Sequence, residues 1–334
     1  MFYILYKFLI NLLLIIIIFI ELKMYRITET IKNNNDNENK LKRIINFYKE
    51  SLQLYIENRE KFYLKGREYF VKLNGKIYNE SNIITIQDKL NYLLIHESPE
   101  NKTEIVDKIL LRNYSEKILG KNICAPILKI YNDIDEIKLE ELPDKFVLKC
   151  NHGSGMNIIC EDKSRFDLAK AKQKLRNWMG INYGLQGFEY QYMNIRKKVF
   201  AEKFLVHDIA DYKFNCFNGE PKFIRVKKHI NGINLNNIYN LNWTLTNLDL
   251  KYLDFVRVPE IKIPKPVNLE KMINYARLLS SKFCFCRVDF YEVDGKVYLG
   301  ELTFIPFNGF MNYNNQETRI YLGNLLNISK IKKV

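Results

Sequence analysis

The feature that most constrains the fold is a pair of apolar segments near the end of the chain, each carrying one acidic residue. Residues 284–291 read Cys-Phe-Cys-Arg-Val-Asp-Phe-Tyr, and residues 296–304 read Lys-Val-Tyr-Leu-Gly-Glu-Leu-Thr-Phe. The turn-forming pair Asp294-Gly295 separates them, so we expect an antiparallel hairpin. Asp289 and Glu301 therefore lie among apolar neighbours, and a buried carboxylate needs a cation nearby.

The length of the turn decides whether the two carboxylates share a face, because side chains alternate between the faces of a strand. A two-residue loop at Asp294-Gly295 puts Asp289 and Glu301 on opposite faces. A three-residue loop that also includes Val293, with the glycine in a left-handed conformation, puts them diagonally on one face. The three-residue loop is therefore the arrangement that allows them to share a metal ion.

A second segment, residues 146–155, reads Phe-Val-Leu-Lys-Cys-Asn-His-Gly-Ser-Gly. It predicts a buried strand that ends in a lysine and a glycine-rich loop. The loop lacks the G-K-[ST] sequence of a P-loop, and a strand is expected to follow it at 157–160. We interpret it as a hairpin whose glycine tip folds over phosphates and donates backbone amides, with Lys149 supplying a point charge. The alternative is a tight turn with an exposed lysine.

Two segments between these sites offer surfaces for the rest of a nucleotide. Residues 201–205, Ala-Glu-Lys-Phe-Leu, have the form of a strand leaving the core, whose backbone could pair with an adenine edge. In residues 211–217, Asp211, Lys213 and Asn215 alternate with aromatic residues and a cysteine, and this polar face suits ribose and phosphate. The alternatives are an ordinary strand end and a solvent-exposed sheet face.

A cation with flexible backbone amides at one place and paired carboxylates at another can hold a nucleotide triphosphate and its magnesium. We therefore favour a metal at Asp289 and Glu301 over an ion pair between one of them and Arg287, which alternates onto the same face. An enzyme that uses ATP is the leading interpretation.

The bulk composition is that of a globular protein, with 334 residues, 47% of them hydrophobic and 27% charged. From residue 123 onward, predicted strands and hairpins alternate with helices, and this pattern predicts an α+β fold with mainly antiparallel sheets. The net charge of +14 is spread along the whole chain. Because no nucleic-acid-binding motif is present, we expect small anions and acidic polymers as partners, and no nucleic acid. The six cysteines form no C-x-x-C pair and are interpreted as reduced core residues of a cytosolic protein.

The first 22 residues are strongly apolar, and two interpretations of them stay open. One is an uncleaved membrane anchor, with the basic residues that follow keeping the remainder at the cytoplasmic face of the membrane. The other is a mis-started extension, with Met24 as the true first residue. Residues 23–84 are expected to form a helical and linker region, with an amphipathic helix over 41–63.

Taken in order, these segments resemble the ATP-grasp superfamily, and most specifically its branch similar to the teichuronopeptide biosynthesis protein TupA. The resemblance runs from about Thr85 to Leu326. The matching pieces are residues 142–155, 201–204, 211–213, 216–219, 287–289 and 300–304. The resemblance implies a domain over 85–330 in which two α+β subdomains, with mainly antiparallel sheets, grip ATP between them.

The resemblance also implies roles for individual residues. The residues that it assigns to the nucleotide are Lys149, Gly153, Ser154, Gly155, Glu202, Lys203, Phe204, Leu205 and Asp211. Magnesium is assigned to Asp289 and Glu301. Many members carry an asparagine two residues further on, where this chain has Thr303, a poorer ligand. The candidate catalytic residues are Lys149, Lys213 and Arg287.

The activity implied by the resemblance is that of an ATP- and Mg²⁺-dependent ligase that phosphorylates a carboxylate and joins it to an amine, releasing ADP. By similarity, the substrates are an amino acid and an acidic surface polysaccharide or its precursor. Two alternatives stay open. One is a glycosyltransferase acting on a nucleotide sugar, although no parallel nucleotide-sugar sheet is predicted. The other is a catalytically silent nucleotide-binding module.

Overall fold

The computed structural model of the protein describes residues 81–97, 102–184, 189–206, 209–250, 255–311, 313, 315–329 and 331. The predicted anchor or extension at 1–22, and residues 23–80 of the helical and linker region, lie outside these residues. In the described part of the chain, no helix is both long enough and apolar enough to cross a membrane.

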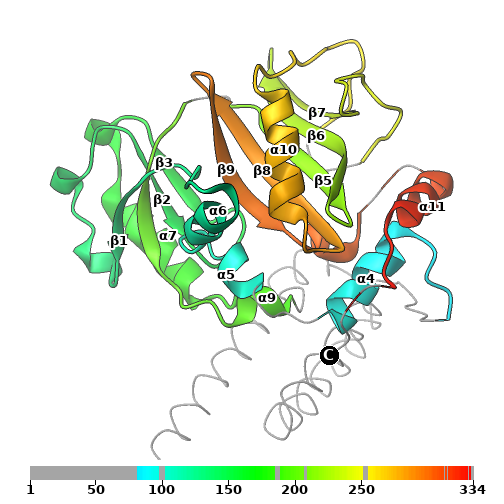
Figure 1. Ribbon diagram of the computed structural model, residues 1–334. Coiled ribbons are helices and arrows are strands. Elements are labelled where there is room, and N and C mark those ends of the chain that lie inside the picture. Colours follow the sequence, from blue (N-terminus) through cyan, green and yellow to red (C-terminus); the bar gives the residue numbers. More distant parts are fainter. Residues whose placement is uncertain are drawn as a thin grey trace, which may run out of the picture.

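Seven α-helices and four 3-10 helices are present in the described part of the chain (Figure 1). The α-helices are α4 (Ile86–His96), α5 (Lys102–Val106), α6 (Leu111–Leu119), α7 (Leu168–Gly180), α9 (Tyr190–Met193), α10 (Leu269–Ser280) and α11 (Gln316–Leu325). The 3-10 helices are η1 (Ile134–Glu136), η2 (Leu139–Glu141), η3 (Lys163–Arg165) and η4 (Pro306–Gly309). Local sequence sets several of their starts. Asp167, for example, accepts a hydrogen bond from the amide of Lys170 and caps α7.

The smaller subdomain is built on a four-stranded antiparallel sheet with the order β1-β4-β2-β3. Its strands are β1 (Ile127–Tyr131), β2 (Phe146–Cys150), β3 (Asn157–Cys160) and β4 (Val199–Lys203). Helix α7 packs against β2, and Leu175 of this helix shares a buried core with Phe146 and Leu148. The predicted hairpin across the glycine-rich loop is confirmed, because Lys149 pairs with Asn157.

The larger subdomain is built on a five-stranded antiparallel sheet with the order β7-β6-β5-β8-β9. Its strands are β5 (Asp211–Phe217), β6 (Glu220–Ile230), β7 (Ile233–Tyr239), β8 (Phe285–Val293) and β9 (Lys296–Thr303). Three of the connections are two-residue turns with positive φ at both positions, at Asn218-Gly219, Asn231-Gly232 and Asp294-Gly295. This conformation, that of a type I′ turn, matches the twist of the paired strands.

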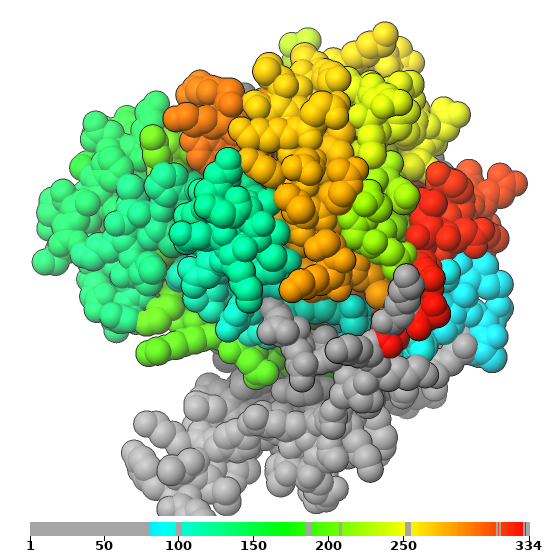
Figure 2. All heavy atoms as spheres, in the orientation of Figure 1, coloured from blue at the N-terminus to red at the C-terminus, as the bar shows by residue number. Residues whose placement is uncertain are grey.

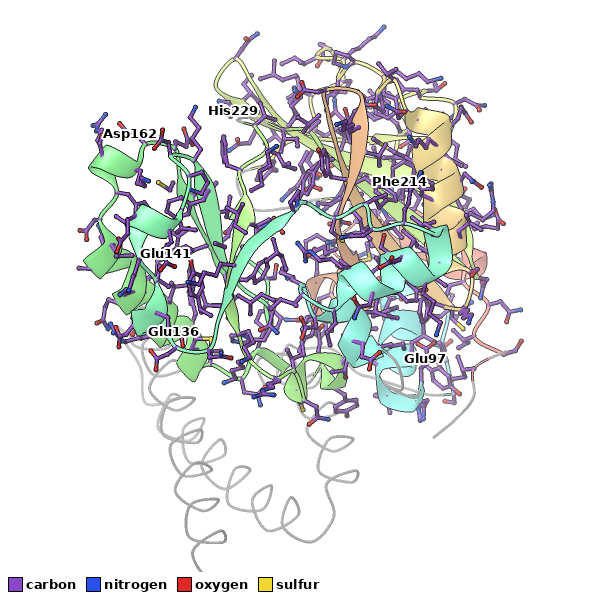
Figure 3. The ribbon with its side chains drawn as sticks, turned by 60° about the vertical axis from the view of Figure 1, so that its left-hand side comes forward. Glu97, Glu136, Glu141, Asp162, Phe214 and His229 are labelled. Carbon is purple, nitrogen blue, oxygen red and sulfur yellow. The ribbon has the colours of Figure 1, made fainter. Side chains whose placement is uncertain are left out.

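The two faces of the five-stranded sheet differ in chemistry. Helix α10 covers one face, on which Phe214, Ile224 and Val288 are fully buried. Figure 3 shows Phe214 in the larger subdomain beside this helix. Residues one position away in the strands, such as Lys213 and Asp289, point to the opposite face. Helices α6 and α10 pack together on the surface seen in Figure 2. Because α10 covers the apolar face, the polar face is the one left for the smaller subdomain and a site.

The predicted α+β class with two mainly antiparallel sheets is confirmed. Two further details were not predicted from the sequence. Strand β7 is one, although Asn231-Gly232 is the turn signal that indicates it. The other is the role of Asn268, which precedes α10: its side chain does not cap the helix and instead donates to Glu292 (2.6 Å).

Candidate functional site

A cavity of about 530 Å³ lies between the two sheets. Its wall includes every residue predicted for the site except Gly153. The smaller subdomain contributes Lys149 and the tip of the glycine-rich loop, and the larger one contributes Asp211, Lys213 and the carboxylates of β8 and β9. Segments more than 140 residues apart in the sequence therefore meet at one place.

Asp289 and Glu301 are direct partners in the antiparallel pairing of β8 and β9. Of the two loop lengths considered from the sequence, the structure has the two-residue turn, because Val293 pairs with Lys296. By itself this register would put the two carboxylates on opposite faces of the sheet. However, the register shifts by one residue at Gly300, which has no partner on β8. This β-bulge restores the shared face. The expected shared face is therefore present, for a different reason.

The bulge at Gly300 requires a glycine. A Cβ atom at this position would lie 2.7 Å from the ring of Tyr291, closer than carbon atoms approach without displacement. We expect Gly300→Ala to lower the free energy of unfolding by about 1–3 kcal/mol, because the ring or the bulge must move. Urea denaturation measures this, with the Gly300→Ala/Tyr291→Leu double variant as the control that regains stability. Equal stability of Gly300→Ala and the wild type would contradict this account.

Asp289 is fully buried and lies between two cations. Arg287 donates to both of its oxygens, at 2.7 and 2.8 Å, and Lys213 donates to Oδ2. Burial would raise the pKa of Asp289, but the charges of Arg287 and Lys213 outweigh it and hold the pKa at about 2. The carboxylate is therefore ionised at neutral pH.

Glu301 is more accessible, with 27% of its side chain exposed. Its Oε1 accepts hydrogen bonds from Arg287 (2.7 Å) and from the hydroxyl of Thr303 (3.3 Å). The ion pair with Arg287, which was the alternative interpretation of these carboxylates, is thus present in the structure, and Arg287 contacts both of them. A metal at Asp289 and Glu301, with Thr303 as third ligand, stays a prediction.

Lys149 lies at the end of β2 and forms an ion pair with Glu202 on β4. Glu202 also accepts a hydrogen bond from Arg112 on α6 (2.8 Å). The backbone amide of the next residue, Lys203, donates to the carbonyl of Pro126 (2.9 Å). Beyond this point the strand ends, and Phe204 and Leu205 lie on the cavity wall. The predicted phosphate lysine and the predicted adenine segment are therefore neighbours.

The base of the glycine-rich loop is anchored, whereas its tip faces the cavity. Asn151 donates to the buried carboxylate of Asp107 (2.8 Å), and His152 contacts the carbonyl of Trp178 (3.1 Å). Burial lowers the pKa of His152 to about 4, so its ring is neutral at physiological pH. Exposed Ser154 and Gly155 form the tip and line the cavity.

Four basic residues of the cavity wall were not predicted from the sequence: Lys108, Arg112, Arg225 and Lys227. Lys108 donates to the carbonyl of Gly153 (2.7 Å), and its ammonium lies 3.8 Å from a carboxylate oxygen of Glu301. It therefore connects the glycine-rich loop to the carboxylate pair. Lys108 and Arg112 belong to no local motif, but Arg225 and Lys227 carry the period-two signal of a strand face.

The D-x-D sequence of the chain, Asp133-Ile134-Asp135, lies away from the cavity. Asp133 caps the short helix η1 by accepting a hydrogen bond from the amide of Asp135 (2.8 Å). The side chain of Asp135 is 69% exposed and pairs with Arg176 on α7. These carboxylates have a structural use, so they give no support to a nucleotide-sugar site.

A family model described as TupA-like ATPgrasp matches residues 88–327, which include both sheets and all the residues of the predicted site. The chain belongs to the TupA-like ATP-grasp family. This confirms the resemblance carried by the ordered motifs, and it confirms the ATP-grasp fold. No curated protein matches the chain.

Solved structures similar to this TupA-like protein include D-alanine–D-alanine ligase from Helicobacter pylori, with 19% identity, 72% coverage of this chain, 68% of that chain and a TM-score of 0.38. D-alanyl-alanine synthetase A from Vibrio cholerae is 13% identical, and the match covers 65% of this chain and 62% of that chain with a TM-score of 0.39. N5-carboxyaminoimidazole synthetase from Staphylococcus aureus is 13% identical, and the match covers 62% of this chain and 46% of that chain with a TM-score of 0.35. The chain thus spans less than half of the last structure.

Proposed function

We propose that the protein is an ATP-dependent carboxylate–amine ligase that forms an acyl phosphate and releases ADP. The observation that carries this proposal is the meeting of Lys149 and the glycine-rich loop, from one sheet, with Asp289 and Glu301, from the other, on one cavity. A cation with backbone amides and a carboxylate pair suit the two ends of a magnesium-bound triphosphate.

The cavity wall fits ATP. Near the end of β4 it carries apolar side chains that suit a planar base, among them Val147, Ile159 and Phe204. Lys149 lies beside this region, where its ammonium pairs with Glu202. The loop tip at Ser154 and Gly155 lines the same cavity, and phosphates there would accept backbone hydrogen bonds. Asp211 lies on the same wall and offers a carboxylate for ribose hydroxyls.

The carboxylates of β8 and β9 offer oxygen atoms, the ligands that magnesium prefers, and Arg287 and Lys213 would share those of Asp289 with the ion. Asp289 stays ionised because of its basic neighbours, and Glu301 lies directly opposite with part of its side chain exposed. Thr303 offers a hydroxyl beside Glu301. When bound, the ion would neutralise charge on the β- and γ-phosphates and act as a Lewis acid there.

The proposed reaction has two steps. In the first, an oxygen of the substrate carboxylate attacks the γ-phosphorus, and the bond to the β-phosphate oxygen breaks to release ADP. In the second, an uncharged amine attacks the acyl carbon, phosphate leaves, and the amide nitrogen loses a proton. Lys213 and Arg287 lie beside the carboxylate pair, where their charges would stabilise the transferring phosphoryl group.

We further propose that the acceptor is a surface polysaccharide or its precursor, and that the reaction takes place in the cytoplasm where ATP is available. This part of the proposal is supported by the family resemblance alone. Attachment to the membrane through residues 1–22 stays a prediction, because these residues lie outside the described part of the chain.

An assay of nucleotide products tests the proposed reaction. With MgATP, a carboxylate such as glutamate and hydroxylamine as the amine, we expect ADP, phosphate and a hydroxamate. Products should depend on the carboxylate. Release of AMP and pyrophosphate would indicate adenylation instead. Release of UDP from a nucleotide sugar without ATP consumption would favour the glycosyltransferase.

Replacing Lys149 with methionine tests its phosphate role. We expect the ATP concentration at half-maximal rate to rise by about tenfold, because one charge-assisted contact to the triphosphate is lost. Lys145→Met is the matched control, since Lys145 lies immediately before β2 but is exposed and lies outside the cavity wall. A lower melting temperature with an unchanged ATP requirement would show that Lys149 serves only as the partner of Glu202.

A further inference from the structure

One row of charged residues crosses the cavity face of the five-stranded sheet. Arg225, Lys213, Asp289 and Glu301 are successive partners on β6, β5, β8 and β9. The row therefore changes from basic at β6 to acidic at β9. The acidic end is the proposed magnesium site, and Lys213 contacts Asp289. The basic end on β6 is not used by the proposed reaction.

Lys227 extends this basic end. It lies two residues after Arg225 on β6, so both side chains share the cavity face, and both line the cavity. Arg225 is only 3% exposed. Burial and the neighbouring cations Arg287, Arg225 and Lys213 lower the pKa values of the pair, to about 10 for Arg225 and about 8 for Lys227. Arg225 is buried and Lys227 is half-buried, so water reaches these two neighbouring cations only in part.

Aromatic rings hold both cations in place. The guanidinium of Arg225 lies 5.1 Å from the ring centre of Phe307, and the ammonium of Lys227 lies 4.0 Å from that of Phe255. Phe307 follows β9 in a left-handed conformation with φ of 56°, which is unfavourable for a bulky residue. Backbone strain of this kind is concentrated at binding sites. Here it places the ring against Arg225.

The charge of the cavity indicates what these cations bind. Among the described residues of its wall, eight side chains are basic and five are acidic. Magnesium ions neutralise much of the charge of ATP, so an excess of positive charge remains when the nucleotide is bound. Two cations in a partly dehydrated pocket favour an anion that can accept several charge-assisted hydrogen bonds.

The strand order sets the distance of this pair from the reacting groups. Strand β5 lies between β6 and β8, and neighbouring strands are about 4.8 Å apart, so the backbone at Arg225 is about 10 Å from that at Asp289. We propose that Arg225 and Lys227 form a subsite for an anionic group, a carboxylate or a phosphate, at the far end of the substrate that reacts with ATP. This inference rests on the proposed function and adds the substrate class, a molecule with a reacting group and a separate acidic group.

Calorimetric titration of the full-length protein saturated with Mg-AMPPNP tests the subsite. Three probes are compared. Suberate has two carboxylates separated by roughly the span from β6 to β8. Octanoate has one carboxylate, and 8-phosphonooctanoate has a carboxylate at one end and a phosphonate at the other. We expect suberate or the phosphonate to bind more tightly than octanoate. The better of the two identifies carboxylate or phosphate as the preferred group.

Variants then locate the binding. We expect Lys227→Met and Arg225→Met each to weaken binding of the preferred probe by about tenfold, the loss of one charge-assisted contact. Arg225→Lys serves if Arg225→Met does not fold. Lys222→Met is the matched control, because Lys222 is exposed on the same strand and lies outside the cavity wall. AMPPNP affinity should change by less than about twofold.

The pH dependence provides a second readout. The groups that face Lys227 are Arg225 on its own strand, Asp211 and Lys213 on β5, and Arg287 on β8. Because its ammonium is charged below pH 8 and neutral above it, probe binding should weaken as the pH rises through 8. Lys227→Arg should keep binding at higher pH, since arginine stays protonated.

Three results would overturn the subsite. Octanoate could bind as tightly as the two probes with a second acidic group, or the variants could bind the preferred probe as tightly as the wild type. The third is a loss of AMPPNP affinity in the variants as large as their loss of probe affinity, which would assign the two cations to the nucleotide. Failure of the wild type to bind Mg-AMPPNP, seen before any probe is added, would refute the proposed function and this inference with it.

Discussion

Replacing Glu301 with glutamine is expected to lower kcat/KM for MgATP by about 100-fold or more, because one of two magnesium-binding carboxylates is lost at the site of phosphoryl transfer. The fold should persist, since Glu301 is partly exposed and Arg287 keeps its contacts with Asp289. Rates of ADP release measured over a range of magnesium concentrations, together with the melting temperature, separate the two effects.

Glu292→Gln is the matched control for this variant. Glu292 lies on the same hairpin, but it bonds Asn268 and is outside the cavity wall, so its replacement should leave the magnesium requirement unchanged. If Glu301→Gln lowers the melting temperature and leaves the magnesium requirement of the reaction intact, the carboxylate serves only the ion pair with Arg287.

Asp289→Asn is expected to have the largest effect on stability, with a loss of about 3–5 kcal/mol in the free energy of unfolding. The substitution removes the charge that lies between Arg287 and Lys213 and leaves both buried cations without it. For this reason Asp289 is a poorer test of metal binding than Glu301, although both carboxylates are candidate ligands. Urea denaturation at neutral pH measures the loss, and Asp144→Asn, at an exposed position, is the control.

The same ion pairs predict the response of the protein to acid. The pKa of Asp289 is about 2 in the folded protein and about 3.9 in an unfolded chain. Its contribution to stability is therefore fully present above pH 4 and is lost as the pH falls from 4 towards 2. The Asp289→Asn variant should show a flatter dependence over this range, and parallel slopes for the two proteins would contradict the assignment.

Local patterns in the sequence predicted the parts of the site that depend on neighbouring residues. The alternation of polar and apolar residues correctly placed Lys213, Arg287 and Asp289 on one face of their strands. The glycine-rich loop correctly predicted a hairpin between β2 and β3. The register of the last hairpin could not be predicted in this way, because alternation within a strand does not reveal the bulge at Gly300, where a Cβ atom would clash with the ring of Tyr291 on the opposite strand.

What the sequence by itself determined were most of the strands, the type I′ turn at Asn218-Gly219 and the side chains that share each strand face, since these follow from residue periodicity and turn chemistry. The tertiary structure alone decided how the hairpins are ordered within each sheet. It placed β8 beside β5, and so Asp289 beside Lys213, and it brought Lys108 and Arg112, which are distant in sequence, to the wall of the same cavity. Strand order depends on how apolar faces pack between segments distant in the chain, and no local pattern encodes that packing.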